Sequence, residues 1–119
     1  MAWSFSSDKP VYLQIADRIR KSVVSGEFKP CEQIPTVRQL ALTAAVNPNT
    51  VQHAFAELEK EGIIVSQGTT GRYVTEDIRI IEACRNNMAQ RLVESFARDM
   101  QELAISNDSI ICMLEEAMK

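Results

Sequence analysis

Two helix starts stand close together in the middle of this chain, and they constrain its fold more than any other feature. Thr36 and Gln39 have the spacing of a capping box, in which the threonine caps a helix and the glutamine reaches back. Asn47 followed by Pro48 is a second start, because asparagine is a favoured N-cap and proline suits the first helical position. The first helix holds barely two turns before the second begins, and this spacing predicts a helix-turn-helix motif.

The second of these helices combines an apolar face with an uncharged polar head. Its apolar residues recur at helical spacing and are Val51, Ala54, Phe55 and Leu58, while Gly62 can end the helix. Hydrogen-bonding side chains occupy the exposed first turns, namely Asn49, Thr50, Gln52 and His53. One interpretation is that these polar residues only cap the helix and face solvent. The other is that these groups recognise a ligand.

The flanking segments favour a winged helix. A first helix is expected over residues 11–25, with Tyr12, Ile15, Ala16, Ile19 and Val23 on its buried side. After the second helix, residues 63–66 and 72–75 are β-prone runs that are separated by a Gly- and Thr-containing turn. We therefore expect a mainly α fold with a small β-hairpin, in which residues 1–75 form a winged helix-turn-helix domain.

Residues 76–119 differ in kind. They predict a long helix over about 77–104 and a short helix over about 107–118 that Ser106 caps. A stripe spaced by three and four residues marks the long helix: Ile81, Cys84, Met88, Leu92, Phe96, Met100 and Leu103. Two helices cannot enclose their own apolar faces, and isolated short helices are marginal in water. We expect these stripe residues to form a homodimer interface.

Charge and cysteine usage set limits on the function. The formal net charge of the 119 residues is −3. Residues 1–75 carry eight basic and seven acidic side chains (8 − 7 = +1), and residues 76–119 carry five and nine (5 − 9 = −4). A polyanion would therefore meet the first segment, although a strongly basic patch is absent. The sequence shows neither a signal peptide nor a membrane span, and Cys31, Cys84 and Cys112 suit reduced thiols in a cytoplasm.

The motifs of residues 10–75 resemble those of a known family. They are P-x-Y-x-Q-I from Pro10, G-x-F-x-P from Gly26, I-P-T-V-R-x-L-A from Ile34, V-N-P-N-T-V from Val46, L-x-x-E-G-I-I from Leu58, and the turn from Gly68 to Val74. This segment is similar to the DNA-binding domain of the GntR family of bacterial transcription regulators, and the short helical tail resembles the YtrA-type branch. The resemblance implies a sequence-specific regulator, a repressor that binds double-stranded DNA as a homodimer on a near-palindromic operator without a cofactor.

The resemblance also implies roles for single residues. Arg38 is expected on phosphate or a guanine edge, the polar head of the second helix in the major groove, and the hairpin tip on the adjacent minor groove or backbone. The full set of expected DNA-binding residues is Thr36, Arg38, Asn47, Asn49, Thr50, Gln52, His53, Gly68, Thr69, Thr70 and Arg72. Cys31 and Ala45 stand where the family usually has glycine.

Several alternatives stay open at this point. Arg38 could only brace Glu32, His53 could be an ordinary surface residue, and the hairpin turn could have no ligand. A winged-helix module that binds protein rather than DNA is the rival function, because the chain is acidic overall. An enzyme is not expected, since Cys31 and His53 lack an orienting third group, and no metal site can be built from these spacings. The sequence does not identify an effector, the operator or the regulated genes.

Overall fold

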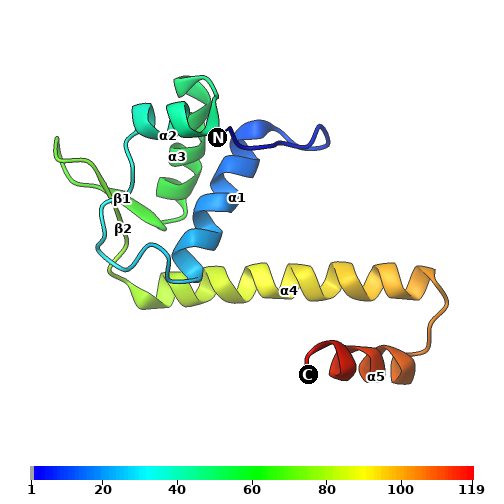
Figure 1. Ribbon diagram of the computed structural model, residues 1–119. Coiled ribbons are helices and arrows are strands. Elements are labelled where there is room, and N and C mark those ends of the chain that lie inside the picture. The colour runs from blue at the N-terminus through cyan, green and yellow to red at the C-terminus, as the bar shows by residue number, and fades with distance from the viewer. Residues whose placement is uncertain (1) are drawn as a thin grey trace. The chain divides into compact units, whose positions relative to one another are not determined.

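Residues 2–119 are described by the computed structural model, and the chain divides into two compact units after Arg85. The described elements are, in order, α1 (Val11–Val24), α2 (Val37–Ala44), α3 (Pro48–Lys60), β1 (Ile64–Ser66), β2 (Arg72–Val74), α4 (Ile78–Glu102) and α5 (Asn107–Ala117) (Figure 1). This confirms the expected mainly α fold with one small β-hairpin. Among these helices, none is both long enough and apolar enough to cross a membrane.

The helix-turn-helix forms through the caps that the sequence indicates. Thr36 Oγ1 accepts from the Gln39 N–H at 3.1 Å, and Gln39 Oε1 accepts from the Thr36 N–H at 2.9 Å. Ala45 then ends α2 in the left-handed region, with φ of 59°. Asn47 Oδ1 accepts from the Asn49 N–H at 2.8 Å and opens α3. The short turn therefore depends on a strained alanine, at a cost of roughly 1–2 kcal/mol.

The three helices of the first unit enclose one apolar core, because α1 and α2 both pack on α3. The largest fully buried side chains are Phe55, Ile15, Leu58, Ile64, Val51 and Val74. Burying one such side chain stabilises the fold by about 1.5–3 kcal/mol. The expected inward faces of α1 and α3 are confirmed except at Tyr12. That prediction was wrong: Tyr12 is only half-buried and stacks against another ring.

A third segment, the connector before α2, stabilises the wing in addition to the two strands of the hairpin. Strands β1 and β2 pair antiparallel, with Val65 opposite Tyr73. The connector before α2 lies along the other edge of β2, since the Ile34 N–H donates to Arg72 O at 2.9 Å and the Val74 N–H donates to Glu32 O at 2.8 Å. Cys31 enters this pairing with φ of 69°. The sequence patterns do not predict this third, strand-like segment.

The first turns of α4 belong to the first unit. Ile81 is 5% exposed and Cys84 is 9% exposed, so both are buried within one chain. The Arg85 guanidinium donates to Val24 O at 2.7 Å, where α1 ends. Ile81 and Cys84 were expected at a dimer interface, and we leave them out of it because their own chain already covers them.

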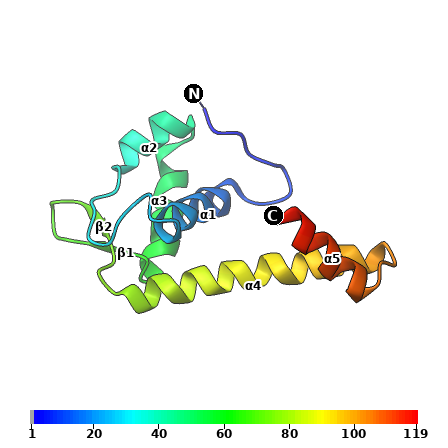
Figure 2. The same cartoon turned by 60° about the horizontal axis from the view of Figure 1, so that its bottom comes forward.

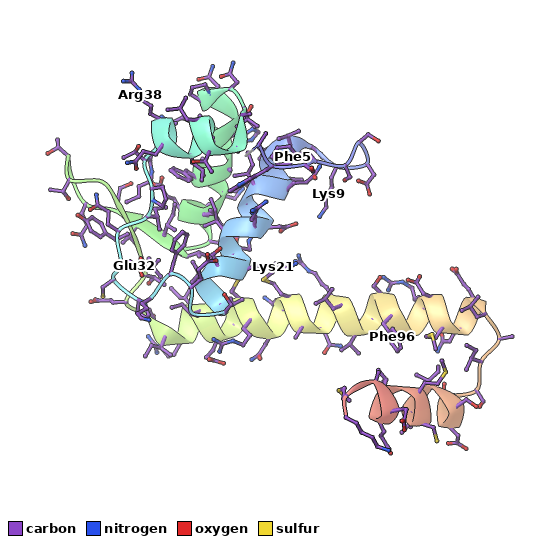
Figure 3. The ribbon with its side chains drawn as sticks, in the orientation of Figure 1. Phe5, Lys9, Lys21, Glu32, Arg38 and Phe96 are labelled. Atoms are coloured by element: carbon purple, nitrogen blue, oxygen red, sulfur yellow. The ribbon has the colours of Figure 1, made fainter. Side chains whose placement is uncertain are left out.

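The second unit, Asn86–Lys119, has no buried residue. Ser106 caps α5 by accepting from the Ser109 N–H at 3.2 Å, as expected. The chain reverses direction between the end of α4 and α5 (Figure 2). Large apolar side chains remain exposed here: Leu92, Val93, Phe96, Leu103, Ile111, Met113, Leu114 and Met118. Figure 3 shows Phe96 on the side of α4 where α5 lies, yet 38% of Phe96 stays exposed.

Candidate nucleic-acid interface

The N-terminal turn of α3 is the centre of the candidate interface. Asn47 caps the helix, and Pro48 at the first position needs no N–H partner. Asn49 is exposed and Thr50 is half-buried, so both side chains stand at the positive end of the helix dipole. A helix N-terminus favours an anion even without charged side chains. The Asn49 and Thr50 N–H groups donate to Asn47 Oδ1 and Asn47 O. The turn can therefore favour phosphate through the helix dipole, while its side-chain amides and hydroxyls meet base edges.

His53 does not stand alone on the surface. Its imidazole stacks on the Tyr12 ring of α1, with ring centroids 3.5 Å apart and planes inclined by 7°. These two rings, with Val11, Asn49 and Thr50, line an open depression of about 350 Å³ beside the head of α3. Tyr12 is therefore a residue of this surface that the sequence analysis placed in the core. The P-x-Y motif was the available signal, but helical periodicity assigned the tyrosine to the apolar face.

Arg38 projects from α2 into solvent (Figure 3). Among residues 2–119 the structure records no ion pair or hydrogen bond for its guanidinium. Glu32, the proposed brace, instead accepts from the Lys29 N–H at 2.8 Å. The neighbouring Thr36 hydroxyl is engaged in the capping box. Arg38 is thus available to an external anion, whereas Thr36 has the structural task of starting α2.

The wing tip is ordered by its own hydrogen bonds. The Gln67 N–H donates to Gly71 O at 2.9 Å, and Thr70 Oγ1 donates to Gln67 O at 2.6 Å. Gln33 Nε2 also donates to Thr70 O at 2.9 Å. Gly71 has φ of 126°, a conformation that residues with a side chain rarely adopt, so the turn favours glycine there. Gly68 and Thr69 remain as the exposed tip.

Arg72 links the wing to α3. Its Nε donates to Glu59 Oε1 at 2.7 Å, and its Nη2 donates to Gln52 Oε1 at 3.3 Å. The guanidinium carbon lies 5.0 Å from the centroid of the Phe55 ring. The Arg72 hydrogen bond is the largest cause that lowers the pKa of Glu59 below its usual value, and the Ser66 hydroxyl adds to it. The carboxylate is therefore ionised at neutral pH, and Arg72 is engaged within the chain.

A cleft lies between α2, α3 and the wing. It encloses about 280 Å³, and its lining includes Arg38 from α2, Gln52 from α3 and Gly71 from the wing turn. The structure thus brings together residues that the sequence separates by more than a whole helix. The expected DNA-binding residues gather at the head of α3, the start of α2 and the wing.

Comparison with known proteins fits this arrangement. The model of the bacterial regulatory proteins of the gntR family matches residues 11–74, which is more than half of the chain. The chain belongs to the GntR family.

Two curated relatives match this chain over different lengths. The uncharacterised HTH-type transcriptional regulator YhcF of Bacillus subtilis is 34% identical over 90% of this chain and 88% of its own length. The HTH-type transcriptional repressor YtrA of Bacillus subtilis is 40% identical over 61% of this chain and 56% of its own. The family and these relatives are transcriptional regulators, so the prediction that this chain is not an enzyme is confirmed.

Solved structures agree with the fold of this GntR member. A GntR-family regulator from Listeria monocytogenes superposes with a TM-score of 0.88, at 39% identity, over 94% of this chain and 98% of that one. The DNA-binding domain of AraR, solved in complex with the operator ORX1, superposes with a TM-score of 0.56 at 25% identity. It covers 63% of this chain and 92% of the AraR domain.

The described residues contain no group of three His, Cys, Asp or Glu side chains that could hold a metal ion. Cys31 and Cys112 are exposed and lie in different units. The polar head of α3, Arg38 and the wing offer hydrogen bonding and charge.

Proposed function

We propose that this GntR-family chain is a sequence-specific DNA-binding repressor that acts as a homodimer on a near-palindromic operator in the bacterial cytoplasm. One observation carries the proposal: the exposed polar head of α3 shares a surface with the unpaired Arg38 guanidinium and the wing cleft. A helix head of this kind fits the major groove, where asparagine and glutamine can pair with base edges. Arg38 adds a planar cation for guanine or phosphate.

Two relatives support the assignment. The AraR domain was solved on an operator, and this chain shares its fold over the winged unit. The YtrA relative is named a repressor. Repression suits a short regulator of this design, because a protein seated on an operator blocks transcription without further contacts.

The exposed apolar side chains of the second unit support the proposed dimer. Residues 86–119 bury nothing by themselves, so a second copy is the occupant that we assign to their apolar surface. The proposed interface consists of Met88, Leu92, Phe96, Met100 and Leu103 of α4, Ile111, Met113 and Leu114 of α5, and Met118 just after α5. A stable dimer needs about 1,200–2,000 Å² of buried surface, and seven of these nine side chains are exposed in the single chain.

Pairing also raises the affinity for DNA. Residues 1–75 have a net charge of only +1 (8 − 7), so one chain neutralises few phosphates. Linking two half-site contacts makes the second contact intramolecular, and avidity can then exceed either single affinity by a factor of roughly 10² or more. The dimer is therefore part of the proposed binding mechanism.

A mobility-shift titration tests the DNA-binding proposal. The full chain is titrated on duplexes from the region upstream of its own gene, at two salt concentrations. We expect saturable, salt-sensitive binding to a near-palindrome, and a loss of at least about tenfold in affinity for Arg38→Ala. Arg79→Ala is the control, because Arg79 is also an exposed arginine and lies outside the proposed surface. An absence of binding at low salt would favour the protein-binding module instead.

A further inference from the structure

The hydrogen bonds between α3 and the wing orient the side-chain amide of Gln52, one of the expected DNA-binding residues on α3. Gln52 lies in the second turn of α3, is exposed, and lines the same cleft as Arg38. Its Oε1 accepts from Arg72 Nη2 at 3.3 Å. A guanidinium has only donors, so the oxygen of the Gln52 amide must be the atom that faces it. The amide NH₂ is then directed away from Arg72, toward the outside.

Arg72 is itself fixed, so it imposes this orientation. Glu59 accepts from Arg72 Nε at 2.7 Å, and Ser66 Oγ donates to Glu59 at 3.0 Å from the neighbouring strand. The Arg72 side chain is 29% exposed and its guanidinium lies 5.0 Å from the Phe55 ring. Two contacts, with Glu59 and with the Phe55 ring, thus restrict the guanidinium on the α3 side of the wing. Gln52, by contrast, has only this one recorded partner among the described residues.

A glutamine presented in this way has a restricted recognition chemistry. Bidentate pairing with adenine needs both amide groups, since the oxygen accepts from N6 and the NH₂ donates to N7. With its oxygen turned toward Arg72, Gln52 presents its NH₂ outward, so the oxygen and the NH₂ no longer face one base edge together as pairing with adenine requires. Guanine presents two adjacent acceptors in the major groove, N7 and O6, while the adenine N6 amino group would oppose the NH₂.

We propose that Arg72 is a specificity-determining positioning residue, which holds Gln52 as a hydrogen-bond donor and thereby makes it select guanine rather than adenine. This inference rests on the proposed DNA-binding function. It assigns Arg72 an indirect role, because its Nε and Nη2 are engaged by Glu59 and Gln52 within the chain. The wing therefore influences base preference at a position that α3 reads.

The test is selection of bound fragments from a pool with randomised half-sites, using the full chain and four variants. For the unmodified chain we expect one position per half-site with a guanine preference of about tenfold over adenine. Gln52→Ala should flatten this position alone. Arg72→Met keeps an unbranched side chain over Phe55 but frees the amide, and it should bring the guanine-to-adenine ratio close to one.

Exchanging the charges of Glu59 and Arg72 should reverse the base preference at the position that Gln52 contacts. In the double variant Glu59→Arg with Arg72→Glu, the new carboxylate accepts from the Gln52 NH₂, so the amide oxygen points outward as an acceptor. The selected base should then change from guanine to adenine or cytosine, which present amino donors. If this variant does not fold, as judged by circular dichroism, Arg72→Met decides the question.

Arg20→Met is the control for a purely structural effect. Arg20 also pairs with the C-terminal end of α3, through Glu61 at 2.5 Å, but it does not contact Gln52. It should lower stability and leave every base preference intact. A guanine preference that survives Gln52→Ala, or that survives both Arg72→Met and the exchange, overturns the inference while the proposed function stands. If the unmodified chain enriches no sequence, the proposed function fails and the inference fails with it.

Discussion

The two units of this chain differ in how their apolar side chains are covered. In the winged unit three helices and a wing enclose Phe55, Ile15 and Leu58 completely. In the unit Asn86–Lys119 not one residue is buried, although Leu92, Leu103 and Met118 are each more than two-thirds exposed. An amphipathic pattern alone therefore does not show where an apolar face is covered. The winged unit covers its apolar face within one chain, whereas we propose that a second chain covers that of the C-terminal unit.

The largest expected effect is the loss of stability when the core of the winged unit is disrupted. Phe55→Ala removes a ring that is 1% exposed, and we expect it to lower the free energy of unfolding by about 3–5 kcal/mol. Leu42→Ala is the matched control, since Leu42 is 78% exposed and should change stability by less than about 0.5 kcal/mol. Urea denaturation followed by circular dichroism measures both. Equal losses would mean that the core is not where the structure has it.

The second prediction concerns the C-terminal unit. Leu92→Glu places a charge on the proposed interface, and we expect the chain to become monomeric at micromolar concentration, with a Kd raised at least about a hundredfold. The thermal midpoint of the unmodified chain should also rise with protein concentration, and that of the variant should not. Sedimentation equilibrium gives the mass. Leu42→Glu changes a leucine of the winged unit that is 78% exposed, and it should leave the mass unchanged.

A smaller gain is expected at the strained turn of the winged unit. Ala45 has φ of 59°, which glycine adopts without steric cost. Ala45→Gly should stabilise the chain by about 1 kcal/mol, since the relief of left-handed strain exceeds the added entropy of the unfolded chain. Thermal denaturation at fixed concentration measures the shift. Ala83→Gly, a change in the regular part of α4, should go the other way by roughly the same amount.

The smallest expected effect is a pH dependence at the wing. The pKa of Glu59 is lowered in the folded chain from its usual 4.5, mainly by Arg72. A lowered carboxyl pKa contributes stability that is present above about pH 4.5 and is lost as the pH falls through the folded value. Because the pair is partly exposed, the contribution is about 0.5 kcal/mol. Glu59→Gln should therefore be less stable than the unmodified chain at pH 7 and equal to it in acid.

The sequence predicted the local parts of this structure well. The capping box at Thr36, the cap at Asn47 and the hairpin strands were read correctly because each depends on neighbouring residues. Tyr12 and Ile81 were assigned to the wrong surroundings, for a physical reason. Helical spacing shows which residues share a face, but not whether that face meets a ring, the same chain or another chain.

The sequence patterns did not predict the side-chain networks, for a similar reason. Arg72, Glu59 and Gln52 come from different elements, and no spacing rule relates them. The stack of Tyr12 on His53 joins α1 to α3 in the same way. Residue types at the candidate interface could be named in advance, whereas the group that each residue presents depends on long-range packing.

The mass of the complex with DNA tests the account most directly. Sedimentation of the full chain with a selected duplex gives the number of chains bound, and a footprint gives the spacing of the contacted segments. The account predicts two chains per duplex, with half-sites centred about 10 base pairs apart or a multiple of that on one face of the helix. A complex that saturates at one chain with full affinity, or two chains on unrelated faces, would contradict it.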